Sequence, residues 1–93
     1  MAATTEIGSL IEHRPDVRGN RPIVAGTGVS VHRLVGWYKL GMSPEEIAEN
    51  FGHLTLAQVY AALAYYHANP EEIEAYLREE EEADRPERSR AAG

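Results

Sequence analysis

Hydrophobic residues recur at helical spacing along the second half of the chain. In residues 42–67 this pattern predicts two helices joined by a tight turn, one over about 44–51 and the other over about 56–68. In the second helix the apolar positions follow the i, i+3, i+4 and i+7 spacing of one face: Leu56, Val59, Tyr60 and Leu63. This arrangement is typical of a helix-turn-helix. An ordinary corner between two helices, with no nucleic-acid role, is the alternative interpretation.

Local signals for helix ends support the same boundaries. Ser43 and Glu46 have the spacing of a capping box at the start of the first helix, and Thr55 and Gln58 repeat it at the start of the second. Gly52 lies between them and can adopt the left-handed conformation that ends a helix. The limits of both helices are therefore predicted by side-chain chemistry as well as by periodicity.

The pattern ahead of these helices is shorter and more β-like. Residues 22–31 alternate apolar and small or polar side chains around Gly26-Thr27-Gly28, which predicts a β-hairpin, and residues 7–13 are expected to form a short strand. Ser30 is a candidate cap for a further helix over about 31–40. The apolar face of that helix is formed by Val31, Leu34, Val35 and Tyr38.

A last helix is predicted from Pro70, after a third cap that combines Asn69 with Glu72. It has one turn of apolar face, followed by an acidic run at 79–82 and a segment of disordered composition at 85–93. The predicted fold is mainly α: a helix-turn-helix bundle preceded by a short β-hairpin and followed by an acidic C-terminal helix. The expected divisions are an N-terminal segment at 1–21, the bundle at 22–68 and the acidic helix and tail at 69–93.

Composition limits this picture to one small domain. Ninety-three residues bury only a modest core, so we expect oligomerisation, most simply a homodimer, to add stability. The absence of cysteine excludes disulfides and thiolate chemistry. No apolar run approaches the length of a membrane span, and we expect a cytoplasmic protein.

Charge is distributed unevenly along the chain. The net charge of −6 argues against a simple nucleic-acid binder. Residues 71–84 hold eight carboxylates and one arginine, whereas the positive charges before residue 45 outnumber the negative ones. An acidic C-terminal segment thus follows a mildly basic body.

Candidate DNA contacts are therefore few. Contacts to backbone phosphates would come from Arg14, Arg18, Arg21, His32, Arg33 and Lys39, although for the loop arginines simple solvation is the preferred interpretation. In the second helix of the helix-turn-helix only Thr55, Gln58 and the tyrosines offer polar groups for base edges, and no basic residue is present. We therefore expect this helix to make few base-specific contacts.

Catalytic and metal-binding patterns are also missing from the sequence. The four histidines do not have ligand spacing, and no serine lies in a nucleophile-elbow motif. Gly26-Thr27-Gly28 resembles a phosphate-binding loop only superficially, because neither GxGxxG nor a following Lys-Ser/Thr pair is present. We expect no catalytic residue, no metal and no cofactor, and hence not an enzyme.

The ordered set of motifs over residues 22–66 resembles the domain of unknown function 433 family. The resemblance is carried by a glycine-threonine turn after a short strand, a capped Ser-x-Glu-Glu helix, a Leu-Thr cap and an alanine-rich helix that ends in aromatics: Pro22, Ile23, Gly26, Thr27, Val29, Val31, Gly41, Ser43, Glu45, Glu46, Ile47, Leu54, Thr55, Ala61, Ala62, Leu63 and Tyr65. It implies a homeodomain-like helix-turn-helix after short strands, often dimeric. The family pattern has an arginine where this chain has Gly28.

The resemblance also implies a function, because members commonly look like VapB-type antitoxins encoded beside a PIN-like ribonuclease toxin. We hypothesise such an antitoxin, which would also regulate its own operon through operator DNA. The acidic segment would cover a basic groove of the toxin, with Ile73, Tyr76 and Leu77 as apolar anchors. Alternatively, the toxin's carboxylate cluster would receive Arg85, Arg88 and Arg90. Truncation after Asn69 is predicted to abolish toxin binding and leave the fold intact.

Two other interpretations stay open. The chain could act as a stand-alone helix-turn-helix transcriptional regulator, with an acidic tail that only increases solubility. It could also be an interaction module whose helix-turn-helix binds no DNA. A DNA-binding assay at several salt concentrations would help to distinguish these interpretations, because an affinity that depends on phosphate contacts falls steeply with salt.

Overall fold

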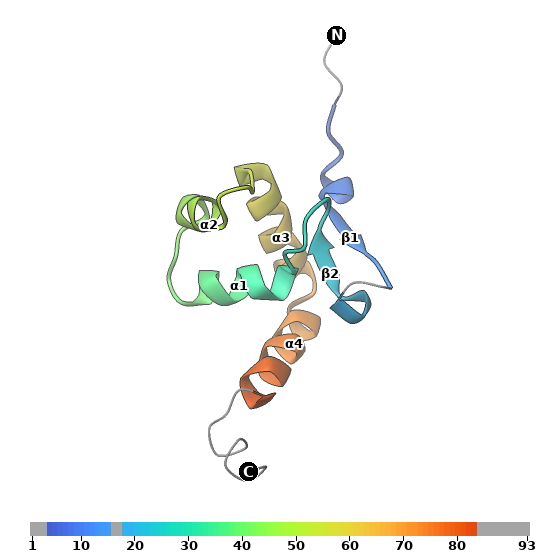
Figure 1. Cartoon of the computed structure of the whole chain (residues 1–93), viewed down its shortest axis with the longest axis vertical. Helices are drawn as coiled ribbons and strands as arrows, with labels where there is room; N and C mark the ends of the chain where they lie inside the picture. Colours follow the sequence, from blue (N-terminus) through green and yellow to red (C-terminus); the bar gives the residue numbers. More distant parts are fainter. Residues whose placement is uncertain (1–3, 16–17, 84–93) are drawn as a thin grey trace.

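The computed structural model describes residues 4–15 and 18–83, in which helices predominate (Figure 1). The elements follow in the order η1 (Ile7–Leu10), β1 (Ile11–His13), η2 (Arg18–Asn20), β2 (Pro22–Val24), α1 (Val31–Lys39), α2 (Pro44–Phe51), α3 (Leu56–Ala68) and α4 (Pro70–Ala83). The fold is mainly helical with a short antiparallel hairpin near the N-terminus, as the sequence predicts. In the described part of the chain, no helix combines the length and apolar character that crossing a membrane requires.

The hairpin is formed by different residues from those expected. β2 pairs with β1, in the register Ile11↔Val24 and His13↔Pro22, instead of with the second half of residues 22–31. After the turn that includes Gly26, the chain pairs with β2 through only one β-bridge, between Ile23 and Ser30. No second strand forms there, because α1 begins at the next residue. The strand predicted at 7–13 is extended only over β1, and its first half is the 3-10 helix η1.

The helix-turn-helix has the predicted limits. Both capping boxes form: the Ser43 and Thr55 hydroxyls accept from the backbone N–H groups of Glu46 and Gln58, at 3.2 and 3.1 Å. The Glu46 and Gln58 side chains in turn accept from the backbone N–H of the two cap residues, each at 2.8 Å. Gly52 ends α2 in the left-handed conformation, with φ of 75°.

Helix α4 begins at Pro70 as predicted, but the predicted capping box of Asn69 and Glu72 does not form. The backbone N–H and side-chain amide of Asn69 both donate to the Tyr65 carbonyl at the end of α3, while the Asn69 carbonyl accepts from the backbone N–H of Ile73 in α4. Glu72, the expected partner, accepts hydrogen bonds from the hydroxyls of Tyr65 and Tyr76. Asn69 alone separates α3 from α4, and this short connection fixes the direction in which α4 leaves the bundle.

The core lies where α1, α2 and α3 meet, with β2 at one side and α4 closing it. Its buried members are Val24, Val29, Val31, Leu34, Val35, Ile47, Leu54, Val59, Ala62, Leu63 and Ile73. Ile73 of α4 is fully buried, and Leu77 packs beside Gly36 of α1. Helix α4 is thus part of the domain. This argues against the expectation that the fold survives truncation after Asn69, because the cut would remove Ile73 from the core.

The buried face of α3 is also rotated from the predicted one. Val59, Ala62 and Leu63 face the core, whereas Leu56 and Tyr60 are 42% and 52% exposed. At 100° per residue, Tyr60 is too far around the helix from Val59 to share its buried face.

Candidate functional site

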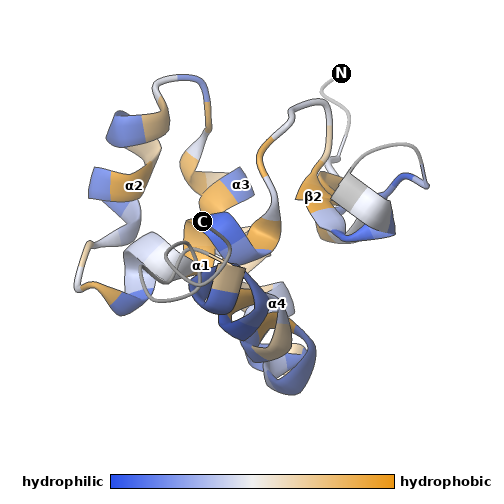
Figure 2. Cartoon of the chain, turned by 60° about the horizontal axis from the view of Figure 1, so that its bottom comes forward, coloured by the Kyte–Doolittle hydropathy of each residue, from blue (hydrophilic) through white to orange (hydrophobic). Residues whose placement is uncertain are grey.

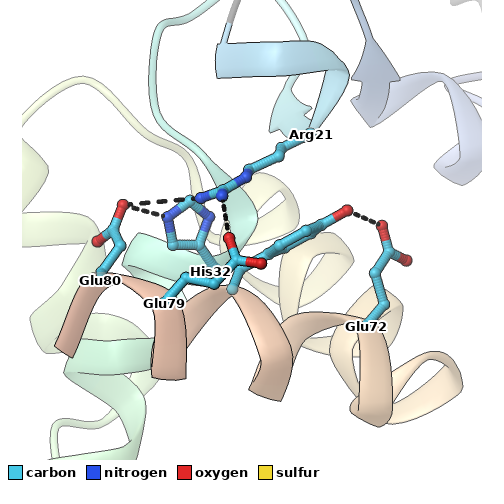
Figure 3. A network of polar contacts seen from close by, with 6 residues as sticks. Arg21, His32, Glu72, Glu79 and Glu80 are labelled. Atoms are coloured by element: carbon cyan, nitrogen blue, oxygen red, sulfur yellow. Dashed lines mark hydrogen bonds and ion pairs between the residues drawn. The ribbon is translucent and has the colours of Figure 1, made fainter. Parts of the chain in front are cut away.

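A cluster of polar side chains joins α4 to the residues that precede β2 and begin α1 (Figure 3). We call it the Arg21 cluster, and it consists of Arg21, His32, Glu72, Tyr76, Glu79 and Glu80. The Arg21 guanidinium pairs with Glu79 and lies 3.9 Å from Glu80. It also lies 4.5 Å from the centre of the Tyr76 ring, a cation–π contact. Arg21 directly precedes β2, so the hairpin holds it over α4.

His32 occupies the buried side of this cluster. Its side chain is 2% exposed, and Nε2 lies 2.8 Å from Oε2 of Glu80. Its ring packs edge-on against Tyr76, with 5.7 Å between the ring centres. His32 is the second residue of α1, and the geometry directs it at α4 and away from solvent, so it contacts its own chain where a phosphate contact was predicted.

A second set of contacts joins the other end of α1 to α4. Lys39 Nζ lies 2.7 and 2.8 Å from the two carboxylate oxygens of Glu74, which also accepts from the Tyr66 hydroxyl at 2.6 Å. The hydrogen bond from Lys39 lowers the pKa of Glu74, and the same bond raises the pKa of Lys39. The pKa of Tyr66 is raised, mainly by its bond to Glu74.

Glu72 links two tyrosines at the start of α4. The hydroxyl of Tyr65 donates to one of its oxygens at 2.8 Å and that of Tyr76 to the other at 2.9 Å. Burial, followed by the bond to Glu72, raises the pKa of Tyr65 to about 12. The same two causes raise the pKa of Tyr76. The neutral phenols are therefore the forms that the fold favours.

The structure thus engages many of the predicted DNA contacts in interactions within the protein's own chain. Arg21, His32 and Lys39 contact carboxylates of α4, and Thr55 and Gln58 are engaged in their capping box. Those five groups are not presented together as a surface for phosphates or bases. Their contacts account for the charge pattern of the sequence, since the basic body and the acidic helix neutralise one another in part.

The remaining basic candidates are scattered. Arg33 is exposed on α1, with its guanidinium 5.8 Å from the ring centre of Phe51, and Arg14 is exposed after β1. The side chain of Arg18 lies outside the described part of the chain, as do Arg85, Arg88 and Arg90.

The predicted apolar anchors of the partner are used by the chain's own fold. Ile73 is fully buried, and Tyr76 and Leu77 are half-buried against α1 and the Arg21 cluster. What α4 presents outward is charge: Figure 2 shows it as predominantly hydrophilic. The exposed carboxylates are Glu71, Glu79, Glu80, Glu81 and Glu82.

Sequence reasoning missed the tyrosine–glutamate pairs between α3 and α4. Tyr65 and Glu72 are seven residues apart and Tyr66 and Glu74 eight, spacings that carry no signal unless the turn at Asn69 is known. Across residues 4–15 and 18–83, no three His, Cys, Asp or Glu side chains gather in a way that would hold a metal ion.

The fold and this site define a class: a small helix-turn-helix domain closed by an acidic helix that its own basic residues hold in place. Residues 11–66 match the family described as "Protein of unknown function (DUF433)", and the chain belongs to that family. It is also similar to the crystal structure of a DUF433 member protein from Anabaena variabilis ATCC 29413. That similarity has a TM-score of 0.71 and 30% sequence identity, and it covers 75% of this chain and 69% of the other. No curated protein matches the chain.

Proposed function

We propose that this protein is a cytoplasmic antitoxin that neutralises a PIN-like ribonuclease by direct protein contact, with the outward side of α4 as the contact surface. One observation carries the proposal: α4 docks its apolar side on the bundle and exposes five carboxylates, of which Glu79 and Glu80 also contact Arg21. A nuclease must attract RNA phosphates with a basic surface, and an acidic helix is complementary to such a surface.

The contacts below α4 support this role. Ion pairs from Arg21 and Lys39, and the buried core contact of Ile73, hold the helix in one position. A binding surface that is already ordered loses less conformational entropy on association than a segment that folds on its target. This differs from the predicted mode, in which the acidic segment orders on the toxin. The alternative contact, through Arg85, Arg88 and Arg90, stays a prediction.

Operator binding receives less support from the geometry than protein binding does. Three predicted phosphate contacts face α4, and the exposed side of α3 is apolar where a recognition helix needs hydrogen-bonding groups. Autoregulation through DNA, and the role of a stand-alone regulator, therefore stay predictions, and the interaction role is the function we assign.

The test uses the open reading frame encoded beside this protein. Its product is induced alone, with the full-length chain, and with two charge-reversal variants. One variant combines Glu81→Lys with Glu82→Lys, which are exposed on α4. Its matched control combines Glu45→Lys with Glu49→Lys, which are exposed on α2.

We expect the neighbouring product to stop growth, and the full-length chain and the α2 variant to relieve the arrest and co-purify with it. The α4 variant should bind at least about tenfold more weakly, since several charge contacts would become repulsive. Absence of toxicity and of a complex would overturn the proposal. Equal loss of binding in both variants would show that α4 is not the contact surface.

A further inference from the structure

The N-terminal half of α3 exposes a continuous apolar face. Leu56, Ala57, Tyr60 and Ala64 are all exposed, with Tyr60 at 52% and Leu56 at 42%. At 100° per residue these four positions fall within about one third of the helix circumference. Isolated surface leucines are ordinary, but a whole helix face of this kind marks an interaction surface.

This face borders a groove of about 380 Å³ between α3 and η1, lined by Ile7, Leu10, Ala57, Tyr60, Ala61 and Ala64. No charged side chain lines it. Ile7, on the η1 side, is 69% exposed, and Tyr60 forms the opposite side. An aromatic side chain from another molecule would therefore meet apolar contacts on both walls.

Charge indicates what occupies this surface. Helix α3 contains no Asp, Glu, Lys or Arg, whereas α1, α2 and α4 each carry charged residues. Two copies of a chain with a net charge of −6 repel one another where their acidic surfaces meet, and they can approach with least repulsion along α3. A basic partner would instead be attracted to α4, which lies at the other end of the molecule from η1 (Figure 1).

We propose that this face is the homodimer interface of the protein, with α3 of one copy packed against α3 of a second copy about a two-fold axis. Tyr60 of each copy would enter the groove of the other. Such an interface is self-complementary, because the same patch is used on both sides. Ala57 and Ala64 are exposed along one side of the helix, and their small side chains permit close approach of the two helices.

The proposed dimer is weak and reversible. A stable interface buries roughly 800 Å² on each partner, and a 13-residue helix is only about 20 Å long. We therefore expect a dissociation constant in the micromolar range.

The dimer also assigns a role to α3 that differs from sequence readout, because Tyr60, one of the polar groups that this helix would present to DNA, lies inside the interface. The inference does not depend on the proposed function.

Sedimentation velocity of the full chain over a range of micromolar concentrations tests the proposal. We expect the wild-type protein to shift from monomer to dimer with rising concentration and Tyr60→Glu to dimerise at least about tenfold more weakly, since it would place two carboxylates in an apolar contact. Leu40→Glu is the matched control, because Leu40 is 84% exposed at the end of α1 and lies outside the groove. This variant should dimerise like the wild type.

A second variant and a crosslink distinguish loss of the interface from misfolding of Tyr60→Glu. Ile7→Glu changes the other wall of the groove without altering any α-helix, and it should weaken the dimer in the same way. The chain has no cysteine, so Tyr60→Cys gives one thiol per copy, and oxidation should yield a disulfide-linked dimer. A wild-type protein that stays monomeric, or folded Tyr60→Glu and Ile7→Glu variants that dimerise normally, would overturn the proposal.

Discussion

The hydroxyl of Tyr65 donates a hydrogen bond of 2.8 Å to Glu72, and this bond spans the one-residue connection between α3 and α4. The bond joins the last turn of α3 to the first turn of α4. Burial and the nearby Glu72 carboxylate both disfavour the ionised form of Tyr65 and so raise its pKa. The arrangement of α4 is therefore coupled to the protonation of this tyrosine.

Alkaline pH should loosen α4 through this bond. The pKa of Tyr65 in the folded protein is about 12, above its ordinary value of 10. Its contribution to stability is therefore fully present below pH 10 and is lost as the pH rises towards about 12. We expect the free energy of unfolding in urea to fall less steeply over this range in Tyr65→Phe than in the wild type. Equal slopes in both proteins would show that Tyr65 ionises normally in the folded state.

Replacement of Ile73 tests whether α4 belongs to the domain. Ile73→Ala should lower the free energy of unfolding by about 2–5 kcal/mol, because the side chain is fully buried in the core. Leu40→Ala is the control, since Leu40 is exposed and should change stability by no more than about 0.5 kcal/mol. Chemical denaturation measures both. A negligible cost for Ile73→Ala would mean that α4 is detached in solution.

An alanine at position 36 is expected to stabilise α1. A Cβ there would lie 3.6 Å from Cδ2 of Leu77, an ordinary van der Waals distance, and Gly36 does not have a positive φ. Gly36→Ala should therefore raise the free energy of unfolding by about 0.5–1 kcal/mol through the helix propensity of alanine. Gly36→Leu is the informative comparison, because its larger side chain should push α4 away and lower the thermal midpoint.

Position 28, where the family resemblance leads us to expect an arginine and this chain has glycine, is tested by adding a side chain. A Cβ at Gly28 would meet no atom within 4 Å, and its φ is not positive. Gly28→Arg should fold with a stability within about 0.5 kcal/mol of the wild type. If the arginine serves partner binding in relatives, the variant should bind the neighbouring gene product more tightly. Calorimetric titration measures that affinity, and an unchanged value would show that position 28 is outside the contact.

The rotation of α3 shows where pattern reasoning from the sequence alone fails. Leu56 and Tyr60 satisfy the apolar spacing of a buried face, yet both are exposed, while the small Ala62 is buried. Helical periodicity counts hydrophobic side chains but does not say which side of a largely apolar helix its neighbours cover. In α3, nearly all of whose residues are apolar, several faces fit the pattern equally well.

The sequence by itself determined the limits of α2 and α3, because capping boxes, helix periodicity and the left-handed Gly52 act within about four residues of the chain. Only the tertiary structure decided the site. Arg21 and Glu79 are 58 residues apart, His32 and Glu80 48, and Lys39 and Glu74 35. Those pairs form because Ile73 is drawn into the core and the turn at Asn69 directs α4 along α1, and these packing constraints have no local signature in the sequence.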